Sequence, residues 1–290
     1  MSYVATDVNE YSHKNENMSD HFSRIALEYH LLRTTDIEPI DFMVQKLKRF
    51  PFVKAADIGC GDGRYDRILC RELGEKLSLT CIDSNAYMLE ALNKNLNEDG
   101  IENYKSMLSA AEELPLPDNS HDCILTFNAI HHFDFDKFTH ECSRVLKDGG
   151  YLFIYTRLRE QNKRNIWGMH FPAFIQKETR LFTQNTITKT LDSVAGMWLQ
   201  SIEYFKYGRL CSLIELEKKI RSHHYSTFFL YTMDELEQAI GKFKERIGKI
   251  YQDIHRIHWY DENVLFVVRK MNELKCDSGF LSYYTRPRIN

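Results

Sequence analysis

The sequence predicts an α/β fold built on a doubly wound, mostly parallel sheet. Three observations support this: a glycine-rich turn follows the apolar run 52–58, short apolar runs recur up to residue 155, and helical patterns separate them. Strands that alternate with helices are typical of βαβ units. Parallel strands are buried on both faces, which explains their continuous apolar character. Ligands of such sheets bind at the carboxyl ends of the strands.

The elements of the first half follow in order. Strands are expected at 52–58, 77–82, 123–127 and 151–155, and helices at 65–73, 86–96 and 137–146.

The second half is less regular. Residues 158–184 are basic and aromatic, 187–194 are expected to form a helix, and 198–205 and 263–270 to form strands. A helix is expected at 213–221, and a capping box at 232–235 is expected to open another.

Composition excludes some classes of protein. The chain has 290 residues with 43% hydrophobic and 27% charged content, which is ordinary for a globular protein. A net charge of −3 gives no general argument for nucleic-acid binding, and no apolar run approaches the roughly 20 residues that span a bilayer. The seven cysteines form no C-x-x-C pair, so we expect reduced, buried thiols, a cytoplasmic protein and no metal site.

The most informative motif is the turn Asp57-Ile58-Gly59-Cys60-Gly61-Asp62-Gly63. Glycines between a buried strand and a helix let backbone N–H groups and a helix dipole approach a ligand, which predicts a nucleotide-type cofactor. The spacing G-x-G-x-G differs from the dinucleotide fingerprint G-x-G-x-x-G. A plain strand-to-helix turn with capping glycines is the alternative.

Asp83 ends the second expected strand, 24 positions after Gly59. A carboxylate there can accept hydrogen bonds from both hydroxyls of a ribose. The alternative is that Asp83 or Ser84 caps the next helix. Met88 on that helix is a candidate for packing against an adenine ring.

The strand, the acidic residue and the glycine turn together resemble motif I of class I S-adenosylmethionine (SAM) dependent methyltransferases. Residues 110–122 resemble the corresponding loop of methyltransferases like those of ubiquinone and menaquinone biosynthesis, also known as methyltransferase type 11. Residues 128–133 and 144–151 resemble two further segments of that family, so the resemblance covers roughly residues 20 to 157. It implies a Rossmann-like, seven-stranded sheet, SAM as cofactor and S-adenosylhomocysteine as product.

The resemblance also implies site residues. It departs from the family at Ala110, where an aspartate is usual, so an adenine contact is lost or passes to Ser109 or Glu112. His131 and His132 are candidate general bases, because they follow the fourth strand and histidine titrates near neutral pH. The residues implied to bind the cofactor are Tyr29, Arg33, Asp57, Gly59, Cys60, Gly61, Gly63, Asp83, Ser84, Met88, Ala110, Ala111, Glu112 and Asn128.

The chain is expected to divide into three parts. Residues 1–35 form an N-terminal arm and a helix that caps the cofactor, and 36–205 with 263–290 form the methyltransferase core. Residues 206–262 stand where this fold usually has a short hairpin, so we expect a helical insertion that acts as a substrate lid. The aromatic residues of the insertion and of 158–184 predict a mostly apolar acceptor pocket with a few polar groups, and many of these residues are expected to form the core of the insertion itself. They are Trp167, Phe171, Phe174, Tyr204, Phe205, Tyr207, Tyr225, Phe228, Phe229 and Tyr231.

A small organic molecule is the leading acceptor, and no acceptor atom or oligomeric state is predicted. The first alternative is tRNA, because residues 129–133 and 152–161 are similar to stretches of wobble-uridine tRNA methyltransferases. The basic residues available for phosphates are Arg157, Arg159, Lys163, Arg164, Lys206 and Arg209. The second alternative is a SAM-binding regulatory or partner subunit without catalysis.

Overall fold

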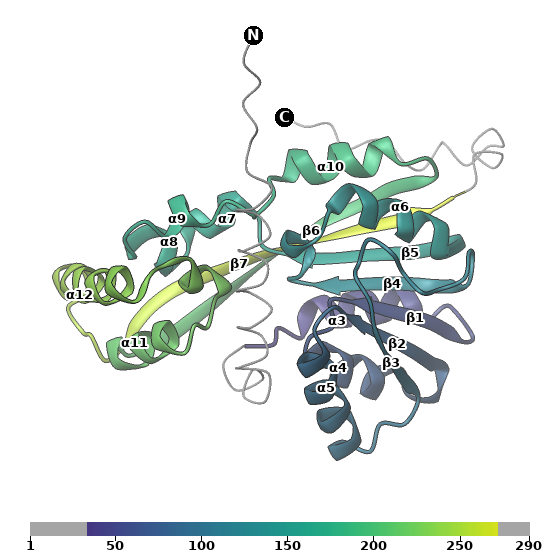
Figure 1. Cartoon of the computed structure of the whole chain (residues 1–290), viewed down its shortest axis with the longest axis horizontal. Helices are drawn as coiled ribbons and strands as arrows, with labels where there is room; N and C mark the ends of the chain where they lie inside the picture. Colours follow the sequence, from purple (N-terminus) through teal and green to yellow (C-terminus); the bar gives the residue numbers. More distant parts are fainter. Residues whose placement is uncertain (1–33, 272–290) are drawn as a thin grey trace, which may run out of the picture.

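A computed structural model of the chain describes residues 34–271. Its centre is a seven-stranded sheet in the order β3-β2-β1-β4-β5-β7-β6 (Figure 1). Strands β1 to β5 are parallel where they pair, and β7 runs antiparallel to both of its neighbours. The predicted α/β, mostly parallel, seven-stranded fold is therefore confirmed. The strands are β1 (Val53–Ile58), β2 (Leu77–Asp83), β3 (Tyr104–Leu108), β4 (His121–Phe127), β5 (Leu146–Thr156), β6 (Met197–Cys211) and β7 (Ile257–Lys270).

Helices cover both faces of the sheet, because alternate residues of the strands feed two separate apolar cores. One core joins the strands to α3, α4 and α5, and the other joins them to α6 and α10. The helices of the sheet layers are α3 (Glu38–Leu47), α4 (Arg64–Leu73), α5 (Ala86–Glu98), α6 (Phe135–Val145) and α10 (Gln184–Ser193). Short 3-10 turns are η2 (Gly74–Lys76) and η3 (Ile130–His132).

Strands β6 and β7 are longer than predicted. They stay paired from Met197 with Lys270 to Cys211 with Ile257, so the boundaries 206 and 262 expected for the insertion fall inside them. Lys206 and Arg209 interrupt the apolar pattern of β6. That half of the strand lies in a two-stranded ribbon beyond the main sheet (Figure 1), where Lys206 is exposed and Arg209, on the other side of the strand, pairs with Asp36 and Asp261.

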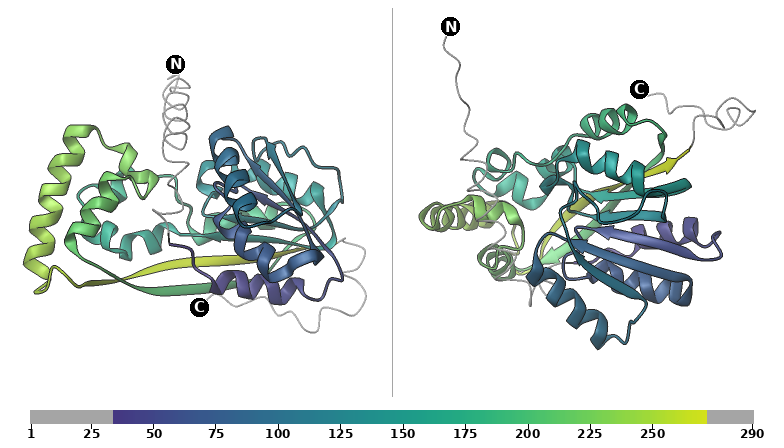
Figure 2. Two further views of the ribbon diagram at one scale, coloured as in Figure 1. Left: turned by 90° about the horizontal axis from the view of Figure 1, so that it is seen from below. Right: turned by 45° about the vertical axis from the view of Figure 1, so that its right-hand side comes forward.

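The ribbon carries a compact helical unit at its far end (Figure 2). Its elements are α7 (Arg159–Arg164), α8 (Ile166–His170), α9 (Phe174–Lys177), α11 (Leu213–Arg221), η4 (Ser226–Leu230) and α12 (Met233–Ile250). The expected helix at 213–221 and the capping box at Thr232 are confirmed. Residues 159–177 join this unit as well, through an aromatic core centred on Trp167, Phe171, Phe228 and Phe243. Within residues 34–271, no helix is both long and apolar enough to cross a membrane.

Trp167 is the residue on which we expect the helical unit to depend most. Its side chain is 1% exposed, and its ring centroid lies 5.4 Å from that of Phe228 and 5.5 Å from that of Phe243. Trp167→Ala should lower the free energy of unfolding by about 3–5 kcal/mol, the cost of emptying a packed aromatic site. Urea unfolding measures it. The control is Trp198→Ala, because Trp198 is 44% exposed on β6. Equal losses in both variants would contradict this prediction.

Candidate functional site

A cavity of about 400 Å³ opens at the carboxyl ends of the parallel strands. One side is formed by the loops after β1, β2 and β4, where the strand order reverses, as expected for ligands of this kind of sheet. The other side is formed by η4, β6, β7 and the residues after β5. Among the predicted site residues, those that line the cavity are Gly59, Cys60, Gly61, Asp83, Ser84, Met88, Ala110, Ala111, Glu112, Asn128, His131 and His132.

The glycine turn has the backbone conformation that its sequence predicts. Gly59 and Gly61 have φ angles of 72° and 57°, which side chains rarely adopt. A Cβ on Gly59 would lie 2.6 Å from the Cβ of Ala129, so only glycine lets the loops after β1 and β4 come this close. A Cβ on Gly61 would meet nothing within 4 Å, because Gly61 faces the open cavity.

Asp83 organises the turn from the end of β2. One carboxylate oxygen accepts a hydrogen bond from the Gly61 N–H at 2.9 Å, and the other accepts from the Asn85 N–H at 2.9 Å. Each oxygen keeps a second lone pair that can accept from a ligand hydroxyl. The alternative role as helix cap is wrong for both Asp83 and Ser84, since the Asn85 side chain caps α5. Burial raises the pKa of Asp83, against the opposing effect of these backbone hydrogen bonds.

Two predicted cofactor residues lie beneath the cavity and do not line it. Gly63 begins α4, where a Cβ would come within 3.0 Å of Leu92, so its role is in packing. Asp57 is buried beside Asp66 of α4. Its position inside β1 places its side chain away from the rim. The predicted residues Tyr29 and Arg33 lie outside the described part of the chain.

Burial and a neighbouring carboxyl change the pKa values of Asp57 and Asp66. Desolvation first, and then the charge of Asp66, raise the pKa of Asp57 well above its usual value. Desolvation raises the pKa of Asp66 to about 7. The pair therefore holds protons at pH values at which exposed carboxyls are ionised.

The loop that departs from the family at Ala110 is held by its own contacts. Ala110 is exposed and lines the cavity. The Glu112 carboxylate accepts from the Asp134 N–H at 2.6 Å, and the Ser109 hydroxyl donates to the Glu113 carbonyl at 2.8 Å. Ser109 and Glu112, the two residues that could replace the aspartate usual at position 110, thus both have hydrogen-bond partners within the protein.

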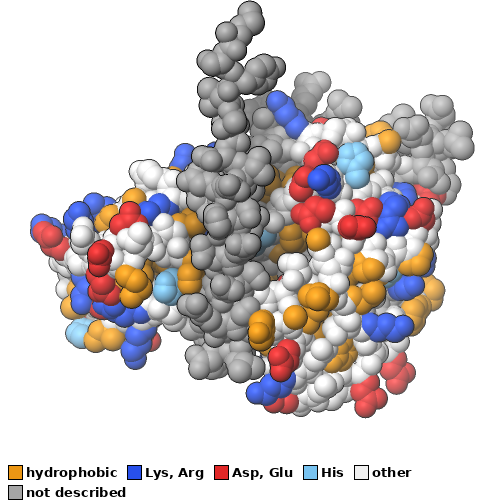
Figure 3. Space-filling model, viewed as in Figure 1, with side chains coloured by type: hydrophobic (Ala, Val, Ile, Leu, Met, Phe, Trp, Pro, Cys, Tyr) orange, Lys and Arg blue, Asp and Glu red, His pale blue; other side chains and the backbone are white. Residues whose placement is uncertain are grey.

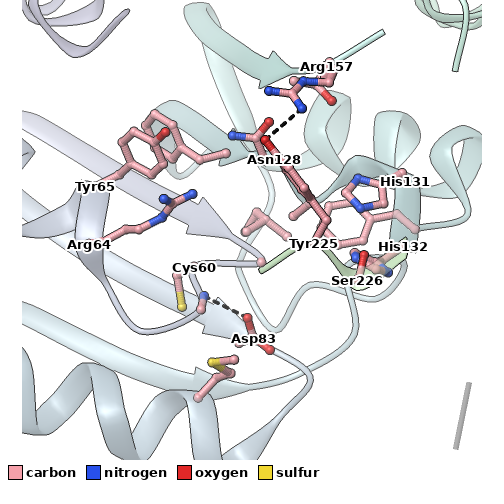
Figure 4. Close-up of a pocket in the computed structure, with 18 of the residues that line it drawn as sticks. Cys60, Arg64, Tyr65, Asp83, Asn128, His131, His132, Arg157, Tyr225 and Ser226 are labelled. Atoms are coloured by element: carbon pink, nitrogen blue, oxygen red, sulfur yellow. Dashed lines mark hydrogen bonds between the residues drawn. The ribbon is translucent and has the colours of Figure 1, made fainter. Parts of the chain in front are cut away.

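The post-β4 segment brings three predicted residues to the cavity wall. Asn128 adopts a left-handed φ of 54°, a conformation that asparagine tolerates better than most residues. His131 and His132 follow in η3 with ring centroids 4.1 Å apart. Figure 4 shows both histidines on the same side as Tyr225 and Ser226, with Asp83 below them.

The opposite end of the cavity is polar, which the sequence reasoning missed. Arg157 donates to the Tyr225 hydroxyl at 2.9 Å and lies 3.3 Å from Asp261 (Figure 4 shows the first contact). Arg209 donates to Asp261 at 3.2 Å and to Asp36 at 2.6 Å. Burial would lower the pKa of Arg157, but Tyr225 and Asp261 outweigh it and keep the guanidinium charged.

The prediction of a mostly apolar acceptor pocket is wrong. Of the aromatic residues named for it, Tyr225 alone is among the described residues that line the cavity. Trp167, Phe171, Phe174 and Phe228 fill the core of the helical unit instead. The lining residues that the sequence reasoning did not name include Asp36, Asn162, Glu178, His224, Ser226, Thr227, Asp261 and Asn263. A signal for this polar lining was available in the sequence: charged and amide residues stand at 209, 261 and 263, inside strands. Residues 34–271 contain no group of three His, Cys, Asp or Glu side chains that could hold a metal ion.

The strand order, the glycine turn and the cavity at the switch point together define the class I SAM-dependent methyltransferase fold. Residues 56–154 match the family model described as a methyltransferase domain. The resemblance found in the sequence is therefore confirmed.

Relatives support the same class. The chain is 35% identical over 103 residues to the uncharacterized methyltransferase YcgJ of Bacillus subtilis, a match that covers 35% of this chain and 40% of YcgJ. It is 29% identical over 148 residues to the ubiquinone/menaquinone biosynthesis C-methyltransferase UbiE of Shewanella sediminis, covering 50% of this chain and 59% of UbiE. The matches thus span about half the length of these relatives.

Two solved structures share the fold at low identity. The crystal structure of Bacillus subtilis YcgJ has a TM-score of 0.58 and 18% identity, and the match covers 82% of this chain and 100% of that one. Geranyl diphosphate C-methyltransferase from Streptomyces coelicolor A3(2), solved with S-adenosylhomocysteine, has a TM-score of 0.52 and 15% identity, with 81% and 76% covered.

The buried acids predict an unusual pH dependence of stability. Because the pKa of Asp66 is raised in the folded state, the contribution of Asp66 to the free energy of unfolding is fully present below pH 4. This contribution is lost as the pH rises to about 7. The free energy of unfolding of the wild type, minus that of Asp66→Asn, should therefore fall between pH 5 and 7, by up to about 1.4 kcal/mol per pH unit. Urea titrations at several pH values measure it. Glu72→Gln, on the exposed side of α4, is the control. A difference independent of pH would overturn this assignment.

Proposed function

We propose that this protein is an enzyme that transfers the methyl group of SAM to a small organic acceptor. The observation that carries the proposal is a single cavity in which the glycine turn and Asp83 face residues of the helical unit. A donor and an acceptor bound at the two ends would share one space. Holding two reactants close and aligned removes much of the entropic barrier of a bimolecular displacement.

The residues at the glycine end fit the cofactor. Asp83 has spare acceptor capacity for ribose hydroxyls, and the open space beside Gly61 leaves room for a ligand against the backbone. Met88 and Ala111 supply apolar lining, together with Cys60. When bound, SAM supplies an electrophilic methyl group on a sulfonium. The protein's part is to bind both molecules, orient them and exclude water.

His131 and His132 are proposed to accept a proton from the acceptor where the reaction releases one. Both line the cavity between its two ends, His131 half-buried and His132 exposed. Their place after β4 puts them beside the glycine turn, through the contact of Gly59 with Ala129.

Four of the six basic residues on which the RNA alternative depended have partners within the protein, and Lys163 and Lys206 are left exposed. Arg157 and Arg209 pair with buried aspartates, and Arg164 pairs with Glu262. Arg159 donates to two backbone carbonyls. On the face shown in Figure 3, basic and acidic side chains of the described residues are interspersed, with no broad basic patch.

We also propose that the protein works in the cytoplasm. The described cysteines are free thiols. Cys60 and Cys81 are buried within hydrogen-bonding distance of each other and form no disulfide. A reducing compartment suits neighbouring thiols of this kind. We propose residues 212–256, together with 159–177, as the lid that covers the acceptor.

Asp83→Ala should weaken binding of S-adenosylhomocysteine by about 1.5–3 kcal/mol, roughly 10- to 150-fold in Kd, because hydrogen bonds to a charged group are lost. Isothermal titration calorimetry measures the affinity. Glu113→Ala is the matched control, since this nearby carboxyl is exposed and does not line the cavity. An unchanged affinity in Asp83→Ala would remove Asp83 from the site.

Replacement of the catalytic base should lower kcat by about 100-fold or more and leave the affinity for S-adenosylhomocysteine within about twofold. His131→Gln and His132→Gln, tested singly, serve as each other's control. Release of S-adenosylhomocysteine from SAM in the presence of a metabolite extract measures turnover. Full turnover in both variants excludes a histidine base. No turnover by the wild type, despite tight binding, would instead favour the regulatory-subunit alternative.

A further inference from the structure

The acceptor end of the cavity carries a balanced set of buried charges. Asp36, Arg209, Asp261 and Arg157 form a chain of alternating sign, joined by contacts of 2.6, 3.2 and 3.3 Å. The Arg157 and Asp261 side chains are 10% and 11% exposed. Buried charges are stable only when they stay paired and hydrogen-bonded. An apolar acceptor bound here would displace water from these charged groups and would form no hydrogen bonds with them in its place, so their desolvation would not be compensated.

The basic side chains of this chain of charges already face carboxylates. Arg209 contacts two of them, and Arg157 contacts Asp261 and the Tyr225 hydroxyl. Glu178 also lines the cavity, and its carboxylate forms an ion pair with Arg180. An anionic acceptor would have to displace one of these carboxylates, with a large desolvation cost for the displaced group.

Two side-chain acceptors at this end of the cavity are not fully hydrogen-bonded by the described residues. Asn263 is 4% exposed and lines the cavity. Its amide nitrogen donates to the Tyr155 hydroxyl at 3.0 Å and to Asp36 at 3.4 Å, whereas its Oδ1 has no hydrogen-bond partner among the described residues. Asp261 Oδ1, two positions earlier on the same strand, lies 3.3 Å from the Arg157 guanidinium but accepts no hydrogen bond of good geometry from the described part of the chain. Buried acceptors without a donor are rare and point to a missing partner.

We infer that the methyl acceptor is a small, polar molecule of no net negative charge, which donates hydrogen bonds from hydroxyl or amino groups to Asn263 Oδ1 and Asp261 Oδ1. Residues 261 and 263 point to the same side of β7, as alternate strand residues do, so one ligand can reach both. The inference deepens the proposed methyl transfer and rests on it. It excludes prenyl-type, phosphorylated and polymeric acceptors.

The test follows a tritiated methyl group from SAM into a cell extract. The extract is incubated with the full-length protein, macromolecules are removed by ultrafiltration, and the filtrate is partitioned between water and chloroform. After chromatographic removal of residual SAM, the aqueous phase is passed over an anion exchanger at neutral pH. We expect the label in the aqueous flow-through. Label in chloroform, on the anion exchanger or in macromolecules overturns the inference and leaves the methyl transfer standing. No label in any fraction overturns the methyltransferase proposal itself, and this inference with it.

Variants then locate the contact. Asn263→Leu should reduce label in the flow-through at least tenfold and leave the affinity for S-adenosylhomocysteine within twofold. Tyr155→Phe is the matched control: it removes one of the two partners of the Asn263 amide nitrogen but leaves Oδ1 in place, and Tyr155 does not line the cavity. We expect Tyr155→Phe to keep transfer within threefold of the wild type. Equal losses in both variants would show that Asn263 acts through its structural hydrogen bonds, and would overturn its assignment to the acceptor.

Discussion

The close approach of two loops at the switch point of the sheet is the constraint on which the site depends. Gly59 after β1 and Ala129 after β4 are in contact only because residue 59 has no side chain. The same turn directs the Gly61 N–H to the carboxylate of Asp83 at the end of β2. Three strand ends are thereby fixed relative to one another, and the cavity is the space that they enclose. A larger residue at 59 would separate the loops and would also strain the backbone.

Most of the first half of the fold, although not α3 or β3, could be predicted because its signals are local. Apolar runs and a glycine turn each depend on residues a few positions apart, and so does the cap of α12 in the second half. The long ribbon of β6 and β7 could not be predicted in this way. Lys206 and Arg209 break the apolar pattern, and the strand is stabilised by its pairing with β7, about fifty residues away in the chain. Residues 159–177 likewise depend on tertiary packing, since Trp167 meets its partners Phe228 and Phe243 only after folding.

The candidate site divides in the same way. The residues of the glycine turn, Asp83 and the two histidines could be named in advance, because they follow strands at known positions. Asp57 was misplaced by the same reasoning: it belongs to the motif, but strand alternation buries it beside Asp66. The acceptor end was missed because Asp36, Arg209 and the β7 residues Asp261 and Asn263 come from three parts of the chain that are far apart in sequence. Arg209 and Asp261 are charged residues inside paired strands, so they depart from the local pattern of a strand. Departures from local rules of this kind are expected at functional sites.

The polar contacts of the acceptor end also hold the helical unit in place. Arg157 follows β5, Tyr225 precedes η4 and Asp261 belongs to β7, so one guanidinium connects the sheet, the helical unit and the ribbon. A rotation of the helical unit about the ribbon would break the contact with Tyr225 and leave a buried charge less well paired, at a substantial cost. In the proposed function, the side chains that recognise the acceptor are thus the same ones that hold its cover in place. An acceptor that completes the hydrogen bonding of Asp261 would therefore also stabilise the closed arrangement of the cavity, because the carboxylate that it contacts is the one that holds Arg157 toward Tyr225.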